Sequence, residues 1–143
     1  MYKIKLPGAT VWSSEPREFW TWKAANGIPV VTVLTNDPVD GVDIANADTM
    51  RRELMAAAAR SKVVIVDMSL EPFCDSQGMN VLDDVADMLA EQGGELRAVI
   101  SRRITLRCLL EIPQRTSQVR VFPTLQGAVY AAPRSQDFQF QAA

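Results

Sequence analysis

The sequence contains no histidine, and this absence removes several kinds of active site. Without an imidazole, neither a serine nor a cysteine can be activated as in the common triads and dyads, and histidine-based metal sites are excluded too. Two cysteines are too few for a four-cysteine zinc site, and there is no glycine-rich P-loop or GxGxxG run to bind phosphate. We therefore expect a binding module without cofactor or metal, and not an enzyme.

Strong charge and long apolar runs are also missing. A formal net charge of −2 gives no reason to expect nucleic-acid binding. No apolar run approaches the roughly 20 residues that span a bilayer, and no basic-then-apolar signal peptide opens the chain. The 143 residues, 48% of them apolar, are enough for one globular domain with a substantial core. We expect a cytoplasmic protein that binds neither nucleic acid nor membrane.

The stretch of residues 62–92 has the clearest pattern in the chain. Its β-branched run, residues 63–66, is typical of a strand that is covered on both faces. After a polar segment, apolar residues recur at the three- and four-residue steps of a helix face, at Met79, Leu82, Val85, Ala86 and Leu89. A pair of glycines then ends the helix. The pattern predicts a buried strand, a short loop and an amphipathic helix with Asp75 or Ser76 at or next to its N-cap.

Ser76 has two interpretations at this position. Serine is a common N-cap because its oxygen accepts a hydrogen bond from a free backbone N–H, so Ser76 can simply start the helix. Alternatively its hydroxyl is a phosphorylation target, since a helix N-terminus tolerates a phosphate well. A phosphate would add roughly −1.5 to −2 charge. Beside Asp75, and near Asp83 and Asp84, that charge would make the surface sharply more acidic and could repel a partner.

Three motifs, in order along the chain, resemble those of the STAS domain, the sulfate-transporter and anti-sigma-factor-antagonist family. The central one consists of Asp67-Met68-Ser69 and Phe73-Cys74-Asp75-Ser76-Gln77-Gly78-Met79. The upstream one is Gly41-Val42-Asp43-Ile44-Ala45-Asn46-Ala47. The downstream one comprises Leu106-Arg107, Leu109-Leu110-Glu111 and Val121-Phe122-Pro123-Thr124-Leu125 with Ala128. The resemblance covers roughly residues 18–132.

The resemblance implies an α/β fold with a single STAS domain over residues 18–132. Such a domain has a small mixed β-sheet with an N-terminal hairpin, flanked by about four helices. Residues 1–17 would form an N-terminal extension and residues 133–143 a flexible C-terminal tail. From the pattern itself, parallel strands are expected wherever a helix lies between two strands.

The resemblance also implies a role as an anti-sigma factor antagonist. In that role the unphosphorylated protein binds a GHKL-type anti-sigma serine kinase and frees a sigma factor. The kinase phosphorylates Ser76 with ATP and magnesium, and a phosphatase reverses the step. The implied partner-binding residues are Asp43, Ile44, Asn46, Cys74, Asp75, Gln77, Gly78 and Met79. Gln77 replaces the second serine of the family motif, and Asn46 has the alternative of being only a helix cap.

Two rival functions remain open. One is a STAS scaffold that assembles as a homodimer or with larger signalling partners, in which Ser76 is structural. The other is a small enzyme that uses Cys74, Asp75 or Asp43 in a cleft. A further hypothesis concerns Cys74 and Cys108, which are either two reduced thiols, as is usual in the cytosol, or a redox-sensitive pair.

The remaining elements follow from local patterns. Asn26-Gly27 predicts a hairpin between residues 18–23 and 29–35, with Val30, Val31, Val33 and Leu34 as core candidates. Residues 2–6 alternate like an edge strand. The other expected elements are helices over 47–60, 101–112 and 124–132 and strands over 95–100 and 119–122. The three tryptophans, Trp12, Trp20 and Trp22, either seal one end of the sheet or form an exposed docking patch.

Overall fold

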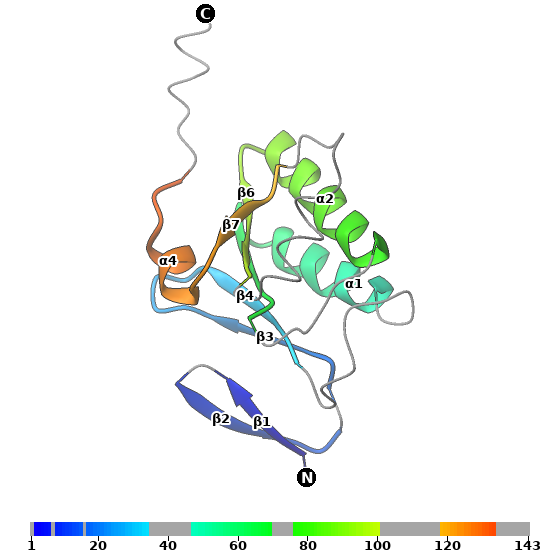
Figure 1. Cartoon of the computed structure of the whole chain (residues 1–143), viewed down its shortest axis with the longest axis vertical. Helices are drawn as coiled ribbons and strands as arrows, with labels where there is room; N and C mark the ends of the chain where they lie inside the picture. Colours follow the sequence, from blue (N-terminus) through cyan, green and yellow to red (C-terminus); the bar gives the residue numbers. More distant parts are fainter. Residues whose placement is uncertain are drawn as a thin grey trace, which may run out of the picture.

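The computed structural model describes residues 2–6, 8–15, 17–34, 47–69, 76–100 and 118–133, and Figure 1 shows their arrangement. The strands in these ranges are β1 (Tyr2–Leu6), β2 (Ala9–Ser13), β3 (Phe19–Lys23), β4 (Pro29–Val33), β5 (Val63–Asp67), β6 (Glu95–Val99) and β7 (Arg120–Phe122). The helices are α1 (Ala47–Ala58), α2 (Ser76–Glu91) and α4 (Leu125–Tyr130).

Strands β3 to β7 form a single sheet in the order β3-β4-β5-β6-β7. β3 and β4 are joined by a short turn and pair antiparallel, whereas β4, β5, β6 and β7 pair parallel with one another. Parallel strands need a crossover connection, and α1 and α2 lie in sequence between β4, β5 and β6. The expected small mixed sheet with an N-terminal hairpin is confirmed.

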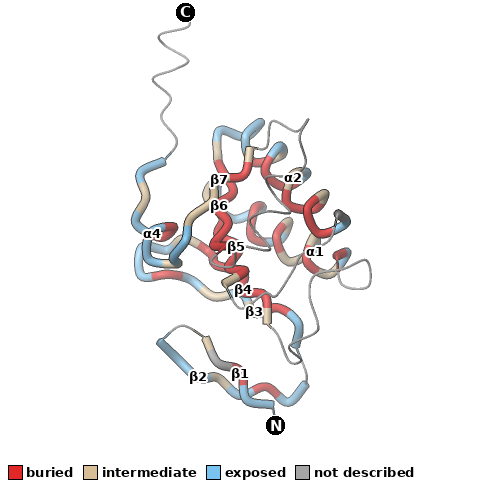
Figure 2. The backbone as a smooth tube through the Cα atoms, viewed as in Figure 1, coloured by how far each residue is buried: buried red, intermediate tan, exposed pale blue. Residues whose placement is uncertain are grey.

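Helices α1 and α2 cover one face of this sheet, and the main core lies between them and the strands (Figure 2). Side chains alternate along a strand, so Val64 and Val66 of β5 point toward these helices and Ile65 points to the other face. The predicted apolar face of α2 is buried here, and so are Met50, Leu54, Ala57 and Ala58 of α1, which follow the same helical spacing. The helical periodicity of the sequence therefore identified this half of the core.

Helix α4 covers the opposite face, over a smaller core of Val30, Ile65, Val99, Ala128 and Val129. The turn between β3 and β4 is fixed to this helix, because the side-chain amide nitrogen of Asn26, Nδ2, donates to the carbonyl oxygen of Val129 at 2.9 Å. The Asn-Gly signal thus marks a true turn, with Gly27 at φ 87°.

The N-terminal region differs from the expectation. Residues 2–6 do form a strand, but it pairs antiparallel with β2 in a separate two-stranded sheet. Strand β2 was not among the expected elements, because Pro7-Gly8 is also a pair that commonly ends a strand. Gly8 has φ 77°, a conformation that glycine adopts without strain, and it precedes the returning strand directly.

Smaller differences concern helix number, helix length and burial. Three helices lie in the described ranges instead of about four, and the helix predicted over 101–112 falls outside them. Helix α4 begins after Thr124, whose hydroxyl accepts a hydrogen bond from the Gly127 N–H at 3.0 Å, and ends before Ala131, where the backbone is extended. Leu34 is half-buried, whereas the other predicted core residues of β4 are buried.

The tryptophans do not act as one group. Trp22 packs against the smaller core, and its indole N–H donates to the buried hydroxyl of Thr32 at 2.9 Å. Trp20 is half-buried, with the Arg17 guanidinium 5.7 Å from its ring centre. Trp12 is 57% exposed. Trp22 therefore seals the sheet, as one interpretation predicted, whereas Trp12 is exposed, as the other predicted.

Candidate partner-binding edge

The four parallel strands end at one edge of the sheet, at Val33, Asp67, Val99 and Phe122. The ladder continues just beyond these ends, because Met68 N donates to the Val99 carbonyl and Ile100 N to the Phe122 carbonyl, both at 2.9 Å. Helices α1 and α2 follow β4 and β5 in the chain, so their first turns lie at the same end of the fold (Figure 1). We call this end the carboxyl edge, the region where open α/β sheets usually bind their partners.

Ser76 is the first residue of α2, in agreement with the sequence-based prediction. The first N–H groups of a helix have no partner within the helix, and the aligned peptide dipoles place a partial positive charge there. Both effects stabilise a negative group, so a phosphate on Ser76 could be held at this helix end without unwinding it.

The residues that follow Ser76 differ in exposure. Gln77 is exposed, whereas Gly78 is buried and Met79 is 1% exposed in the main core. Gly78 and Met79 were predicted to bind a partner; both are buried here, and their role in binding stays a prediction. Of these three residues, Gln77 is the one that a partner can reach.

The other predicted site residues lie outside the described residues: Asp43, Ile44, Asn46, Cys74, Asp75 and Cys108. Their roles, including the redox pairing of the two cysteines, stay predictions.

Asp67 is a residue of this edge to which the sequence reading gave no role beyond its place in a motif. Its side chain is 1% exposed, and its Oδ1 accepts a hydrogen bond from Ser69 N at 3.0 Å. This Asx-type bond turns the chain at the end of β5. Its Oδ2 is buried without a hydrogen-bond partner within the described part of the chain. An acidic residue directly after a β-branched run is the sequence signal for this turn.

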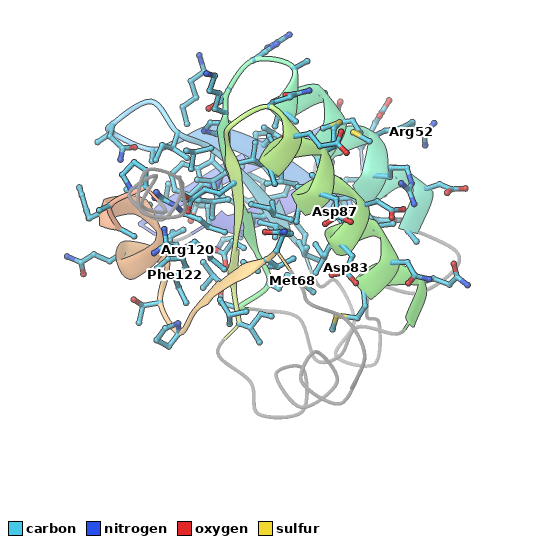
Figure 3. The ribbon with its side chains drawn as sticks, turned by 90° about the horizontal axis from the view of Figure 1, so that it is seen from above. Arg52, Met68, Asp83, Asp87, Arg120 and Phe122 are labelled. Carbon is cyan, nitrogen blue, oxygen red and sulfur yellow. The ribbon has the colours of Figure 1, made fainter. Side chains whose placement is uncertain are left out.

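The surface of α2 behind Ser76 is acidic. Figure 3 labels Asp83 and Asp87 along this helix and Arg52 on the neighbouring α1. Arg51 of α1 forms an ion pair with Asp84 at 2.9 Å, which links the two helices across a solvated surface. On this surface Arg52 is exposed, whereas Arg51 joins the two helices.

Two other features are absent from the described ranges. No three His, Cys, Asp or Glu residues gather there closely enough to hold a metal ion. Among the helices of these ranges, none has the length and apolar character needed to cross a membrane.

Comparison with solved structures shows which proteins share this fold. An anti-sigma factor antagonist from Mycobacterium paratuberculosis has a TM-score of 0.62 at 22% identity, over 82% of this chain and 96% of that one. A proposed anti-sigma factor antagonist from Thermotoga maritima has a TM-score of 0.60 at 17% identity, over 78% and 91% of the two chains.

A third similar structure is part of a much larger protein. The murine Solute Carrier 26 family member A9, an anion transporter, has a TM-score of 0.55 at 20% identity, over 81% of this chain but 18% of the transporter. No curated protein matches the sequence significantly. The family model of the STAS domain, by contrast, matches residues 26–128. Since that match covers most of the 143 residues and the five-stranded sheet with its helices lies largely within it, the chain belongs to the STAS domain family.

Proposed function

We propose that this protein is an anti-sigma factor antagonist, active in the cytoplasm, whose binding to an anti-sigma factor is controlled by phosphorylation of Ser76. The partner is a serine kinase of the GHKL type, which uses ATP and magnesium. The unphosphorylated protein binds the kinase and frees a sigma factor, and a phosphatase restores the unphosphorylated form. In this scheme the protein is a substrate and a switch, and it catalyses nothing itself.

The observation that carries the proposal is the position of Ser76 as the first residue of α2. Free backbone N–H groups and the helix dipole can stabilise a phosphate at this place, so phosphorylation need not disrupt the fold. The fold shared with one anti-sigma factor antagonist and with one proposed antagonist supports the general role.

The effect of phosphorylation on binding follows from desolvation. A phosphate carries roughly −1.5 to −2 charge, and it must lose water when it enters an interface. A partner surface shaped around a neutral hydroxyl supplies no cation to compensate this loss. Asp83 lies about two turns further along the same helix and adds negative charge on that side, whereas the charge of Asp84 is paired with Arg51. The phosphorylated form should therefore bind the kinase much more weakly.

The second candidate function is a STAS scaffold without a phosphoserine switch, which includes homodimer formation. The similarity to a segment of an anion transporter favours it, because the matched segment is 18% of a much larger chain. In this case Ser76 serves only to begin α2.

A pull-down from the lysate of the source cell, read by mass spectrometry, separates the two candidates. The baits are the wild type, Ser76→Ala and Ser76→Asp, with Ser14→Asp as a matched control at an exposed serine outside the carboxyl edge. The switch predicts capture of a GHKL-type kinase by all baits except Ser76→Asp. Equal capture by all four, or capture of no kinase, would favour the scaffold.

A further inference from the structure

The outer edge of β3 is the starting point for a second binding site. β3 is the first strand of the five-stranded sheet, and within the described residues no strand pairs with its outer side. The hydrogen bonds Leu34 N to Glu18 O and Ala24 N to Ile28 O identify the hydrogen-bonded positions at the two ends of the β3–β4 ladder. The pattern alternates in an antiparallel pair, so the backbone N–H and C=O groups of Phe19, Thr21 and Lys23 point away from β4.

A cavity of about 390 Å³ lies beside this edge. Thr21 and Lys23 of β3 form one side, and the last turn of α1 forms the other through Ala56 and Ala57. The turn before β4 closes one end. The cavity is thus a groove between an edge strand and a helix, which we call the β3–α1 groove. This is the geometry in which an extended peptide can add a strand to a sheet and insert a side chain beside it.

The charges around the β3–α1 groove favour an acidic ligand. Lys23 and Arg60 both line it, both are exposed, and neither forms an ion pair with another described residue. Glu53 is the acidic residue of the lining, and its carboxylate accepts a hydrogen bond from the Thr21 hydroxyl at 3.1 Å. Its one negative charge stands against the two positive charges of Lys23 and Arg60, so the lining is positive on balance. The carbonyl end of α1 repels anions, so an acidic group should lie against Lys23 and Arg60 instead of over the helix end.

We propose that the β3–α1 groove binds an extended peptide segment of a protein partner, with a large apolar residue in the cavity and an acidic residue against Lys23 and Arg60. The peptide forms main-chain hydrogen bonds with Thr21 and Lys23, and alternate side chains of a strand share one face. The apolar and acidic residues are therefore two positions apart. The start of β4 and the end of α1 line this groove, so it lies at the opposite end of the parallel strands from Ser76 and is independent of the phosphoserine switch.

The probe is a phage-displayed library of random linear octapeptides, selected on the full chain and followed by titration of the enriched peptides. We expect sequences in which an acidic residue lies two positions from a large apolar one. Lys23→Glu/Arg60→Glu should weaken their binding about tenfold, and exchanging the acidic residue of the peptide for lysine should restore it. Lys3→Glu/Arg52→Glu makes the same charge change at exposed residues outside the groove and should have no effect.

Amide hydrogen exchange tests the main-chain part of the proposal. Peptide binding should slow exchange at Thr21 and Lys23, whose N–H groups gain partners, and leave the first turn of α2 unchanged. The proposal is overturned if no sequence pattern is enriched, if the charge-reversed protein binds the peptides equally well, or if protection appears at α2. It is also overturned if Thr21 and Lys23 become protected with rising protein concentration alone, because the occupant is then a second copy of this chain.

Discussion

Replacing Glu95 by glutamine should destabilise the fold far more than removing an exposed charge. Glu95 is 4% exposed, and its Oε2 accepts hydrogen bonds from Arg97 Nε at 3.0 Å and from Arg120 Nη1 at 2.7 Å. Arg97 is 1% exposed and also donates to the Ala128 carbonyl at 2.7 Å. Without the carboxylate, a buried guanidinium keeps its positive charge and loses its counter-charge.

The structure sets the size of this effect. Breaking a buried ion pair by removing one partner costs about 3–5 kcal/mol. The glutamine carbonyl oxygen has two lone pairs and can still accept both hydrogen bonds, although without the negative charge, so we expect the lower end, about 3 kcal/mol. This corresponds to a fall of about 10 °C in Tm for a chain of this length. The network also joins the sheet to the chain after α4, since Arg120 donates to the Ala132 carbonyl at 2.8 Å. In Figure 3, Arg120 also lies over Phe122, with its guanidinium 5.1 Å from the ring centre.

Urea denaturation and thermal unfolding, followed by circular dichroism, measure this prediction. The matched control is Asp84→Asn, which removes a carboxylate from an ion pair whose side chains are 37% and 54% exposed and should cost less than about 1 kcal/mol. The double variant Glu95→Gln/Arg97→Met, which removes both buried charges, should be more stable than the sum of the single changes predicts. The reasoning is refuted if Glu95→Gln unfolds at the same urea concentration as Asp84→Asn.

Three further changes test the packing. Gly94→Ala should strongly reduce soluble folded protein, because a Cβ there would overlap the Lys62 carbonyl group that pairs with Glu95 N, and expression with thermal unfolding would check this. Trp22→Phe should cost about 1 kcal/mol through the lost hydrogen bond to Thr32, measured against Trp12→Phe at an exposed position. Leu82→Ala should cost about 2–5 kcal/mol in urea, since Leu82 is fully buried under the sheet, and a smaller loss would contradict the assigned core.

The sequence correctly predicted those elements whose apolar residues follow a regular pattern along the chain. The run of residues 63–66 is β-branched throughout because β5 lies at the centre of the sheet with helices on both faces. The three- and four-residue spacing gave the buried face of α2, and with it the place of Ser76 at the start of that helix. The Asn-Gly pair gave the β3–β4 turn.

The features that depend on distant partners were not predictable in the same way. In β6, Glu95 and Arg97 alternate with Leu96 and Ala98, a pattern that normally indicates a solvated face. Glu95 and Arg97 can be buried because they form an ion pair, which the chain around α4 covers. The local sequence pattern does not reveal this distant cover. Strand β2 was missed because Pro7-Gly8 matches both the end of a strand and a tight turn. The β3–α1 groove unites residues from β3 and α1 that are far apart in the sequence.

The most direct test of the proposed switch is a calorimetric titration of the purified serine-kinase anti-sigma factor with this protein, before and after phosphorylation, with the modified residue identified by mass spectrometry. We predict that the phosphate is on Ser76 and that the phosphorylated protein binds about 100-fold more weakly than the unmodified one. Ser76→Ala should bind like the unmodified protein and accept no phosphate. Equal affinity of the two forms, or a phosphate on another residue, would contradict the account.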